Sequence, residues 1–361
     1  MAWKFDKSEK YFIMNKVLIV DPLSYSGHVN YNHGIIRAIS KSYDYDIIVN
    51  ESVADKLTNK GIDNRHFIET YPDEWNIVEL SKRMNKFFYH IAFRYYFIKL
   101  IFKIAFLKKD YDAIIITCID IFAFSLVSWL LGDKVYVVDH GIGLLANSRA
   151  YRIAWKLTCS KINLIVLEEF IKEMASKLLK NRKIYVVKHP LPAKINIIKP
   201  TEKDTSGHII LFGPSGSNDE SFLESLRKAE IPDDIKIVAK SHILEIKNDN
   251  LILYKNYVSD EDYLYYLNMS KYLLLAYPSS YNYRISAVLF EALRMQKPVL
   301  LYANNTLVHY QKIFPGQVCL FNSVNDLFEK MRVFTPKSSN DELNSYSDEE
   351  LAQSINKMLN A

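Results

Sequence analysis

Asp139 and His140 are the residues of this chain whose types and position best suit proton transfer. They end the apolar run from Lys134 to His140 and lead into a turn at Gly141. A histidine beside an aspartate can act as a general base or polarise a hydroxyl group. Such a run predicts a buried strand, and ligands bind at the carboxyl ends of parallel strands. We therefore predict catalytic roles for both residues, with a structural histidine in a turn as the alternative.

Two further segments, both in the second half of the chain, suit a phosphate-bearing ligand. The cation of Lys240-Ser241-His242 follows an apolar run and can neutralise a diphosphate, although a solvated turn fits the same residues. Gly213, Ser215 and Gly216 lie in a loop after another apolar run, where backbone N–H groups can approach a phosphate. No Walker lysine follows that loop, which argues against a P-loop.

The stretch from Asn256 to Tyr302 reads as helix, strand, loop, helix and strand. Ser259 with Asp262 forms a capping box, and Ser286 can cap the second helix. The loop before Ser286 therefore lies where a strand leads into a helix N-terminus, the usual anion position in an alternating α/β sheet. Arg284 in this loop is a candidate phosphate ligand, with a plain surface arginine as the alternative.

This stretch resembles the donor-binding half of GT-B glycosyltransferases, two-domain enzymes that use nucleotide sugars. It keeps Glu291 and Lys297-Pro298-Val299 of that pattern. It departs eight residues before Glu291, where Tyr283 replaces the first glutamate of a spaced pair. A smaller branch carries a Tyr-Arg-x-Ser loop, to which Tyr283-Arg284-Ile285-Ser286 is similar. Lys240-Ser241-His242 also resembles the KPH element of glycerophosphate polymerases and capsule transferases.

The resemblance implies an α/β fold of GT-B architecture, in which two Rossmann-like doubly wound domains face a central cleft. It implies that Glu291 binds the ribose of a nucleotide-sugar substrate, that Tyr257 and Val258 border the nucleobase, and that no cofactor or metal is bound. The donor-binding residues that we expect are Gly213, Ser215, Gly216, Lys240, His242, Tyr257, Val258, Tyr283, Arg284, Ile285, Ser286 and Glu291, and the acceptor-side residues are Gly27, His28 and Asn30.

The length and the order of apolar runs predict two domains, because 361 residues exceed what one core usually holds. The chain opens with an apolar run, a loop with one glycine and a helical pattern, as doubly wound sheets do, but without a GxGxxG fingerprint. A capped helix with ordinary surface polar groups is the alternative to an acceptor site in that loop. We predict an acceptor-side domain 1–190, a linker 191–206, a nucleotide-sugar-binding domain 207–345, and a C-terminal helix 346–361 that packs back across the boundary.

The composition is that of a globular protein, with 49% hydrophobic and 24% charged residues. The net charge of +5 suits phosphate-bearing ligands or anionic lipid and is too weak to argue for nucleic acid. Cys118, Cys159 and Cys319 are few, odd in number and surrounded by apolar residues, so we expect reduced, buried thiols in a cytoplasmic protein. Residues 1–15 show no signal-peptide pattern.

The segment from Lys82 to Lys109 has eight lysines or arginines, nine aromatic residues and no acid. Apolar residues recur at helical spacing, as at Ile91, Tyr95, Phe102 and Phe106. Basic amphipathic helices rich in aromatic residues bind anionic membrane surfaces. We therefore predict peripheral contact with the inner face of the cell membrane; an amphipathic core helix with a solvated basic face is the alternative.

A second apolar segment, from Ile114 to Leu131, is long enough to span a bilayer. Asp120 interrupts it, and a mid-segment acid is costly in a membrane. We expect a strand at 113–117 followed by a helix at 120–131 that Asp120 caps.

Together these features predict a glycosyltransferase that moves a sugar from a nucleotide-sugar donor to a glycan or lipid-linked acceptor in surface polysaccharide synthesis. A glycerophosphate or phosphosugar transferase of similar architecture is one alternative, and a nucleotide-sugar epimerase shares the fold. A catalytically silent, glycan-binding protein is another, because Tyr283 cannot supply a carboxylate.

Overall fold

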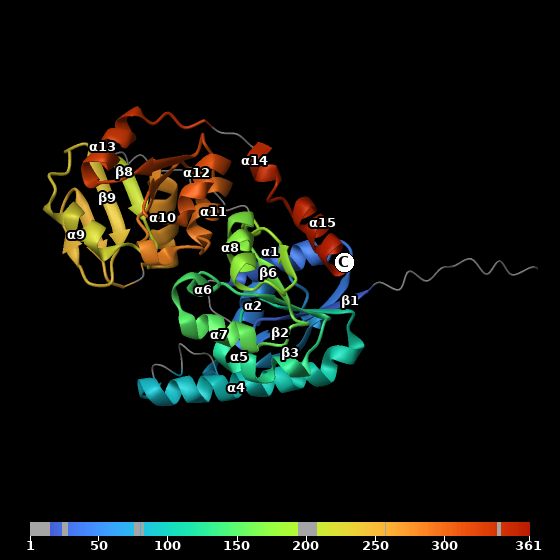
Figure 1. Cartoon of the computed structure of the whole chain (residues 1–361). Coiled ribbons are helices and arrows are strands. Elements are labelled where there is room, and N and C mark those ends of the chain that lie inside the picture. The colour runs from blue at the N-terminus through green and yellow to red at the C-terminus, as the bar shows by residue number, and fades with distance from the viewer. Residues whose placement is uncertain are drawn as a thin grey trace, which may run out of the picture.

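The computed structural model describes residues 15–23, 28–75, 80, 83–193, 208–256, 258–337 and 341–361. Gly27, Tyr257 and most of the predicted linker 191–206 lie outside these residues. The described chain forms two halves, each built on one twisted sheet with helices on both faces (Figure 1).

The first half is a seven-stranded sheet in the order β3-β2-β1-β4-β5-β6-β7, with every strand pair parallel. Its strands are β1 (Lys16–Val20), β2 (Asp44–Asn50), β3 (Phe67–Tyr71), β4 (Ala113–Ile116), β5 (Val135–Val138), β6 (Asn163–Val166) and β7 (Ile184–Val186). Its helices are α1 (Val29–Ile39), α2 (Glu51–Asn59), α4 (Lys86–Leu107), α5 (Ile121–Val127), α6 (Leu144–Asn147), α7 (Arg149–Leu157) and α8 (Glu169–Leu178).

The second half is another seven-stranded sheet, in the order β10-β11-β9-β8-β12-β13-β14. Only the edge pair β10–β11 is antiparallel among the described strands. Its strands are β8 (Ile209–Gly213), β9 (Ile235–Lys240), β10 (Ile246–Lys247), β11 (Leu251–Tyr254), β12 (Tyr272–Leu275), β13 (Val299–Tyr302) and β14 (Val318–Phe321). The helices that follow β8 are α9 (Glu220–Lys228), α10 (Asp260–Met269), α11 (Ala287–Arg294), α12 (His309–Ile313), α13 (Val324–Val333), α14 (Asp341–Asn344) and α15 (Asp348–Leu359).

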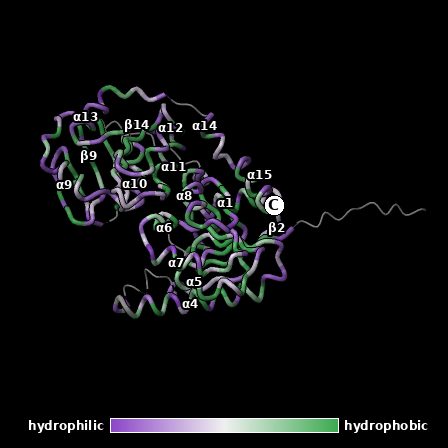
Figure 2. The backbone as a smooth tube through the Cα atoms, viewed as in Figure 1, coloured by the Kyte–Doolittle hydropathy of each residue, from purple (hydrophilic) through white to green (hydrophobic). Residues whose placement is uncertain are grey.

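The central strands are short, continuous apolar runs because helices cover both faces of each sheet. β4, β5, β6 and β12 are buried at every position, and Figure 2 shows the apolar residues gathered in the interior of both halves. Each sheet separates two apolar clusters, one on each face. This arrangement confirms the predicted α/β class with two doubly wound sheets.

The last helix, α15, returns to the first half of the chain (Figure 1). Leu351, Ile355 and Met358 are buried in the apolar cluster that α1 also forms. Arg37 of α1 pairs with Asp348 at 2.8 Å. The chain therefore passes between the halves a second time, and its last helix packs on the first half.

The loop between β12 and α11 packs directly against the first half. Ile285 contacts both apolar clusters of the first half and one of the second. The carbonyl oxygen of Asn282 approaches Gly143 so closely that a Cβ added there would lie 2.2 Å from it. Tyr283 holds the turn at a left-handed φ of 59°, and its N–H donates to Thr306 Oγ1 at 2.6 Å.

The segment from Ile114 to Leu131 folds as predicted, with β4 followed by α5. Asp120 caps α5, since its carboxylate accepts from the backbone N–H of Ala123 at 2.8 Å. Within the part of the chain that the structure describes, no helix combines the length and apolar character needed to cross a bilayer.

The helix α4 is apolar on two sides, unlike the basic amphipathic helix that was predicted. Phe93, Phe97, Ile101 and Ile104 are buried in the first half. The other side exposes large apolar residues, namely Phe88, Ile91, Tyr95, Phe102 and Phe106. Two of its cations pair with carboxylates of other elements, Arg94 with Asp120 and Lys103 with Glu69. Lys108, directly after the helix, donates to the Leu130 carbonyl.

A buried carboxyl group joins the two halves near the chain crossing. Glu168, directly after β6, accepts hydrogen bonds from the hydroxyl groups of Tyr310 at 3.1 Å and Tyr346 at 2.7 Å. Burial raises its pKa to about 7, against the hydrogen bonds and the attraction of Lys188, which lower it. The Glu168 carboxyl group therefore gains or loses its proton near neutral pH.

We expect the Glu168 contact to make stability depend on pH. The Glu168 carboxyl group binds its proton more tightly in the folded chain than in the unfolded chain. Its protonation therefore stabilises the fold fully below pH 4.5, and this stabilisation is lost as the pH rises to about 7. Glu168→Gln keeps an acceptor for both tyrosines, so its thermal midpoint should match the wild type near pH ~5. It should exceed the wild type near pH ~8, by the equivalent of roughly 3 kcal/mol at most. A difference that stays constant with pH would contradict this assignment.

Candidate active site

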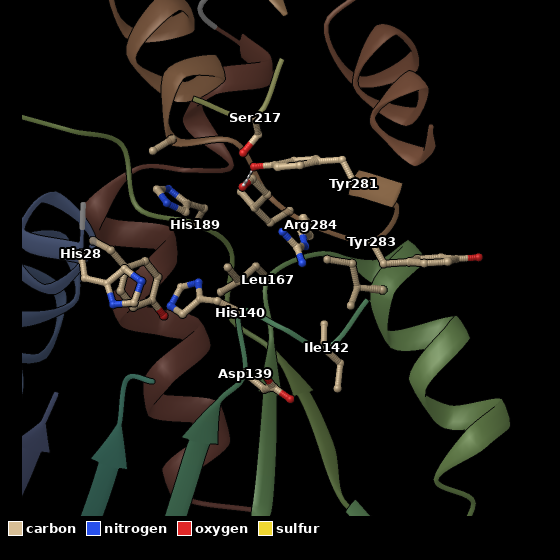
Figure 3. A pocket seen from close by; sticks show the side chains of 14 residues that line it. His28, Asp139, His140, Ile142, Leu167, His189, Ser217, Tyr281, Tyr283 and Arg284 are labelled. Atoms are coloured by element: carbon tan, nitrogen blue, oxygen red, sulfur yellow. Dashed lines mark hydrogen bonds between the residues drawn. The ribbon is translucent and has the colours of Figure 1, made fainter. Parts of the chain in front are cut away.

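A cavity of about 250 Å³ lies between the two halves, at the carboxyl ends of the first sheet's strands. Side chains from both halves line it and converge on one space (Figure 3). Its lining residues are His28, Tyr31, Asp139, His140, Ile142, Leu167, Ile171, His189, Ser217, Tyr281, Tyr283, Arg284, Ile285 and Ala287.

His140 lies in this cavity, two residues after the end of β5. Its ring stacks on His28, with centroids 4.7 Å apart, and meets the edge of Tyr31 at 5.0 Å. Burial lowers its pKa to about 3, helped by the neighbouring histidines His28 and His189. Its Nε2 is buried and has no hydrogen-bond partner among the described residues. A neutral imidazole with an unpaired nitrogen can accept a proton from a ligand that enters the cavity.

Asp139 and His140, the two predicted catalytic residues, do not hydrogen-bond to each other. Its carboxylate turns into the first half (Figure 3). It accepts hydrogen bonds from the Tyr151 hydroxyl at 2.6 Å, from Trp155 Nε1 at 2.8 Å and from the Gly141 N–H at 2.8 Å. Burial raises its pKa against these bonds, which lower it. Asp139 therefore fixes the turn that presents His140 rather than exchanging a proton with it.

Arg284 reaches into the cavity from the second half (Figure 3). Its guanidinium lies 5.7 Å from the ring centroid of Tyr281. Its Nε is buried without a hydrogen-bond partner among the described residues, and no carboxylate there pairs with it. A buried Nε–H without a partner is costly, so this geometry favours an anionic ligand that satisfies it.

Ser286 and Glu291 have partners within the protein. The Ser286 hydroxyl oxygen accepts from the Leu289 N–H at 3.1 Å, as the predicted cap, and also bonds to the Tyr277 hydroxyl at 2.7 Å. Glu291 accepts from the Tyr263 hydroxyl and from Asn30 Nδ2 at 3.4 Å. Glu291 thus bridges the halves, and burial raises its pKa.

Lys240 and His242 do not line this cavity. The Lys240 ammonium is directed at the backbone carbonyls of Ser241, at 2.9 Å, and Lys255. The backbone N–H of His242 donates to Glu220 at 2.5 Å, as the Ser241 hydroxyl does at 2.6 Å. These hydrogen bonds tie the segment Lys240-Ser241-His242 to neighbouring backbone carbonyls and to Glu220.

Of the remaining predicted donor-binding residues, some pack within the second half and others line the cavity. Gly213 lies inside β8, where an added Cβ would be 3.1 Å from that of Ala239. Ser215 accepts from the Ser217 N–H at 3.1 Å, and Ser217 itself lines the cavity. Gly216 and Val258 are not among the cavity's lining residues, whereas Tyr283 and Ile285 are.

Eight lining residues were not predicted from the sequence, and four of them carry polar or aromatic groups: Tyr31, His189, Ser217 and Tyr281. His189 lies near the predicted end of the first domain at 190 and was given no role there, yet it follows β7 closely, and strand ends are where ligands bind. Its Nδ1 donates to the Pro190 carbonyl at 2.8 Å, and its ring stacks on Phe290 at 4.7 Å. Burial lowers its pKa to about 4, so the cavity holds two neutral histidines.

Of the predicted acceptor-side residues, His28 lines the cavity and Asn30 contacts Glu291. Gly27 is outside the described residues. Within the described ranges, no three histidine, cysteine or acidic side chains are placed to hold a metal ion. The expected absence of a cofactor remains a prediction.

Comparison with solved structures identifies the architecture. Anabaena Alr3699/HepE in complex with UDP and glucose aligns with a TM-score of 0.62 at 12% identity, covering 96% of this chain and 99% of that one. The lipopolysaccharide outer core galactosyltransferase WaaB aligns with a TM-score of 0.55 at 14% identity, covering 95% and 98%. A protein described as a UDP-N-acetylglucosamine 2-epimerase from Listeria monocytogenes gives 0.57 at 14%, covering 96% of both.

These likenesses, at low identity over nearly the whole of each chain, show that the chain has the GT-B fold. No protein-family model matches the sequence, and no curated protein matches it significantly.

Proposed function

We propose that the chain is a glycosyltransferase that moves a sugar from a nucleotide-sugar donor to a glycan or lipid-linked acceptor in surface polysaccharide synthesis. The observation that carries this proposal is the interdomain cavity, where the unpaired Arg284 guanidinium of one half shares a space with the unpaired His140 Nε2 of the other. Two of the solved structures that share this fold contain UDP with glucose or UDP-glucose, which supports a nucleotide-sugar donor.

Arg284 supplies the charge that the leaving nucleoside diphosphate needs. Sugar transfer passes through an oxocarbenium-like centre while the bond from C1 to the diphosphate oxygen breaks. Preorganised cations in a site that excludes water stabilise the developing negative charge. Arg284 Nε is already desolvated and lacks a partner, so it has little reorganisation to undergo when the diphosphate arrives.

His140 accepts the proton of the acceptor hydroxyl group. Its pKa of about 3 keeps the ring neutral at physiological pH, and its unpaired Nε2 is the accepting atom. The low pKa makes it a weak base, so proton transfer follows formation of the new bond, when the hydroxyl has become acidic. Asp139 acts as a positioning residue through its bonds to Tyr151, Trp155 and the Gly141 N–H.

Glu291 binds the ribose of the donor. Its carboxylate accepts from Asn30 across the halves at 3.4 Å, a long hydrogen bond. Ribose hydroxyl groups are better donors to a carboxylate at close range, so an entering nucleotide replaces Asn30. Loss of that contact would also release one link between the two halves.

The exposed side of α4 supports a membrane contact for this enzyme. Phe106, Tyr95 and Phe88 expose 77%, 62% and 58% of their surface. Lys99, four residues after Tyr95 on the helix, is exposed, and so is Lys109 just beyond its end. Aromatic side chains that the core does not use, flanked by lysines, fit the boundary of an anionic bilayer. These observations support our proposal that the chain works at the inner face of the cell membrane.

A glycerophosphate transferase remains the competing enzyme class, together with a nucleotide-sugar epimerase and a silent glycan-binding protein. A thermal-shift screen of nucleotide sugars and CDP-polyols separates them. Stabilisation by one nucleotide sugar, with transfer or slow hydrolysis, supports a glycosyltransferase. Stabilisation by a CDP-polyol, conversion to an epimer, or no ligand at all would each replace that proposal.

We expect Arg284→Ala to weaken UDP binding on the order of tenfold to a hundredfold and to remove most activity, because a charge-assisted bond to a phosphate is lost. Isothermal titration with UDP and a transfer assay measure the two effects. Arg332→Ala, an exposed arginine on α13, is the matched control and should leave both unchanged. Unaltered UDP affinity in Arg284→Ala would refute its role.

The membrane contact predicts binding to vesicles of phosphatidylcholine mixed with phosphatidylglycerol in preference to phosphatidylcholine alone. Tyr95→Ser with Phe106→Ser should weaken that binding on the order of tenfold or more, because two inserting rings are removed. Ile243→Ser with Val333→Ser removes comparably exposed residues from the second half and serves as the control. Equal binding to both vesicle types, or equal effects of the two variants, would end this assignment.

A further inference from the structure

A second hollow lies at the opposite ends of the first sheet's strands from His140. It is formed by α7 and the loop before β6 on one side, and by the end of α8 and the loop before β7 on the other. Its volume is about 650 Å³. We call it the basic basin; its lining residues are Arg152, Trp155, Lys156, Thr158, Ser160, Lys177, Leu178, Leu179, Lys180, Asn181 and Arg182.

Five cationic side chains and no carboxylate line the basic basin. Three of them, Lys156, Lys177 and Lys180, are exposed, and no hydrogen bond or ion pair joins them to another described residue. Like charges gathered around one hollow raise the local positive potential. The basin therefore attracts an anion, and its lysines have donors to spare for one.

Arg182 forms the rigid floor of the basin. Its guanidinium donates to the carbonyl oxygens of Cys159 and Ile162, each at 3.0 Å, and to the Thr158 hydroxyl at 2.6 Å. It also lies 5.1 Å from the ring centroid of Trp155, which is fully buried. No carboxylate offsets its burial, which lowers its pKa. The positive charge at the floor is thus held in place without a counter-ion from the protein.

An apolar rim adjoins the basin. Ile153 and Leu157, on the same helix as Arg152 and Lys156, expose 47% and 66% of their surface. Leu126 and Trp129, exposed by 65% and 68%, belong to α5 and the turn after it, and α5 packs between α4 and α7. Figure 1 shows these three helices in succession beside the first sheet. Exposed apolar residues thus continue from α4 toward the basin.

We propose that the basic basin binds the phosphate of an anionic lipid headgroup while the rim of α7 and α5 contacts the acyl boundary. The proposal rests on the membrane contact proposed for α4 and adds to it a defined headgroup site. The combination favours lipid over a soluble phosphate, because a soluble ligand has no use for Leu157 and Trp129. Lysine stems can lie along the rim while their ammonium groups reach the phosphate.

The test is vesicle flotation of the full chain and of Lys156→Ala with Lys180→Ala. We expect this variant to bind vesicles that contain phosphatidylglycerol on the order of tenfold more weakly than the wild type, because each lysine near an anionic surface contributes appreciably. Binding to pure phosphatidylcholine should not change. Lys247→Ala with Lys312→Ala removes the same charge from exposed positions of the second half and should behave as the wild type.

Equal losses in the two double variants would show a general charge effect and overturn the site. Glycerol 3-phosphate separates the two sources of the phosphate. If it binds the wild type but not the Lys156→Ala, Lys180→Ala variant, while both bind vesicles equally well, the basin is a soluble-anion site and the lipid assignment is overturned. If the wild type binds no vesicle at all, both the headgroup site and the membrane contact of α4 are overturned. UDP affinity, measured on the same variants, should stay at the wild-type value, so the donor site is judged separately.

Discussion

The contact between Asn282 and Gly143 sets the distance between the two halves of this molecule. The carbonyl oxygen comes so close that only glycine fits, because any Cβ there would lie 2.2 Å from it. Ile285 then enters apolar clusters of both halves three residues further on. One loop of the second half is therefore packed into the first, and Arg284 between these two contacts is carried into the cavity. If this loop packed less closely against the first half, the guanidinium would be in water, where its charge is screened.

The close packing of this loop against the first half also determines the charges inside the cavity. Burial keeps His140 and His189 neutral, so they do not repel the Arg284 cation. The Asp139 carboxylate is occupied by Tyr151, Trp155 and the Gly141 N–H, and does not compete for that cation. Within the described residues, the cavity therefore holds the unpaired Arg284 cation beside neutral proton acceptors, which is what the proposed transfer requires.

Much of the fold could be predicted from the sequence, because it depends on local patterns. The run at 134–140 became β5, Asp120 and Ser286 cap their helices as expected, and the segment 114–131 divides into strand and helix. For α4, periodicity found the apolar residues but not their partners. Both sides of that helix are apolar, and only tertiary packing decides that Phe97 is buried and Phe106 exposed.

The site was harder to predict, because its members meet through the packing of the two halves. His189 lies next to the predicted domain boundary and carries no motif, and nothing local to Tyr31 or Ser217 indicates a cavity. Lys240 shows a second reason: a lysine at a strand end can turn to backbone carbonyls as easily as to a ligand, and its ammonium contacts the Ser241 carbonyl here. Asp139 and His140 are neighbours in sequence, yet their side chains point apart (Figure 3).

A crystal structure of the chain with UDP tests the central claim most directly. The account predicts the diphosphate in the interdomain cavity, within hydrogen-bond distance of the Arg284 guanidinium, with the His140 ring facing the space beyond the terminal phosphate. A diphosphate bound elsewhere, or one in the cavity with Arg284 turned away from it, would contradict the account.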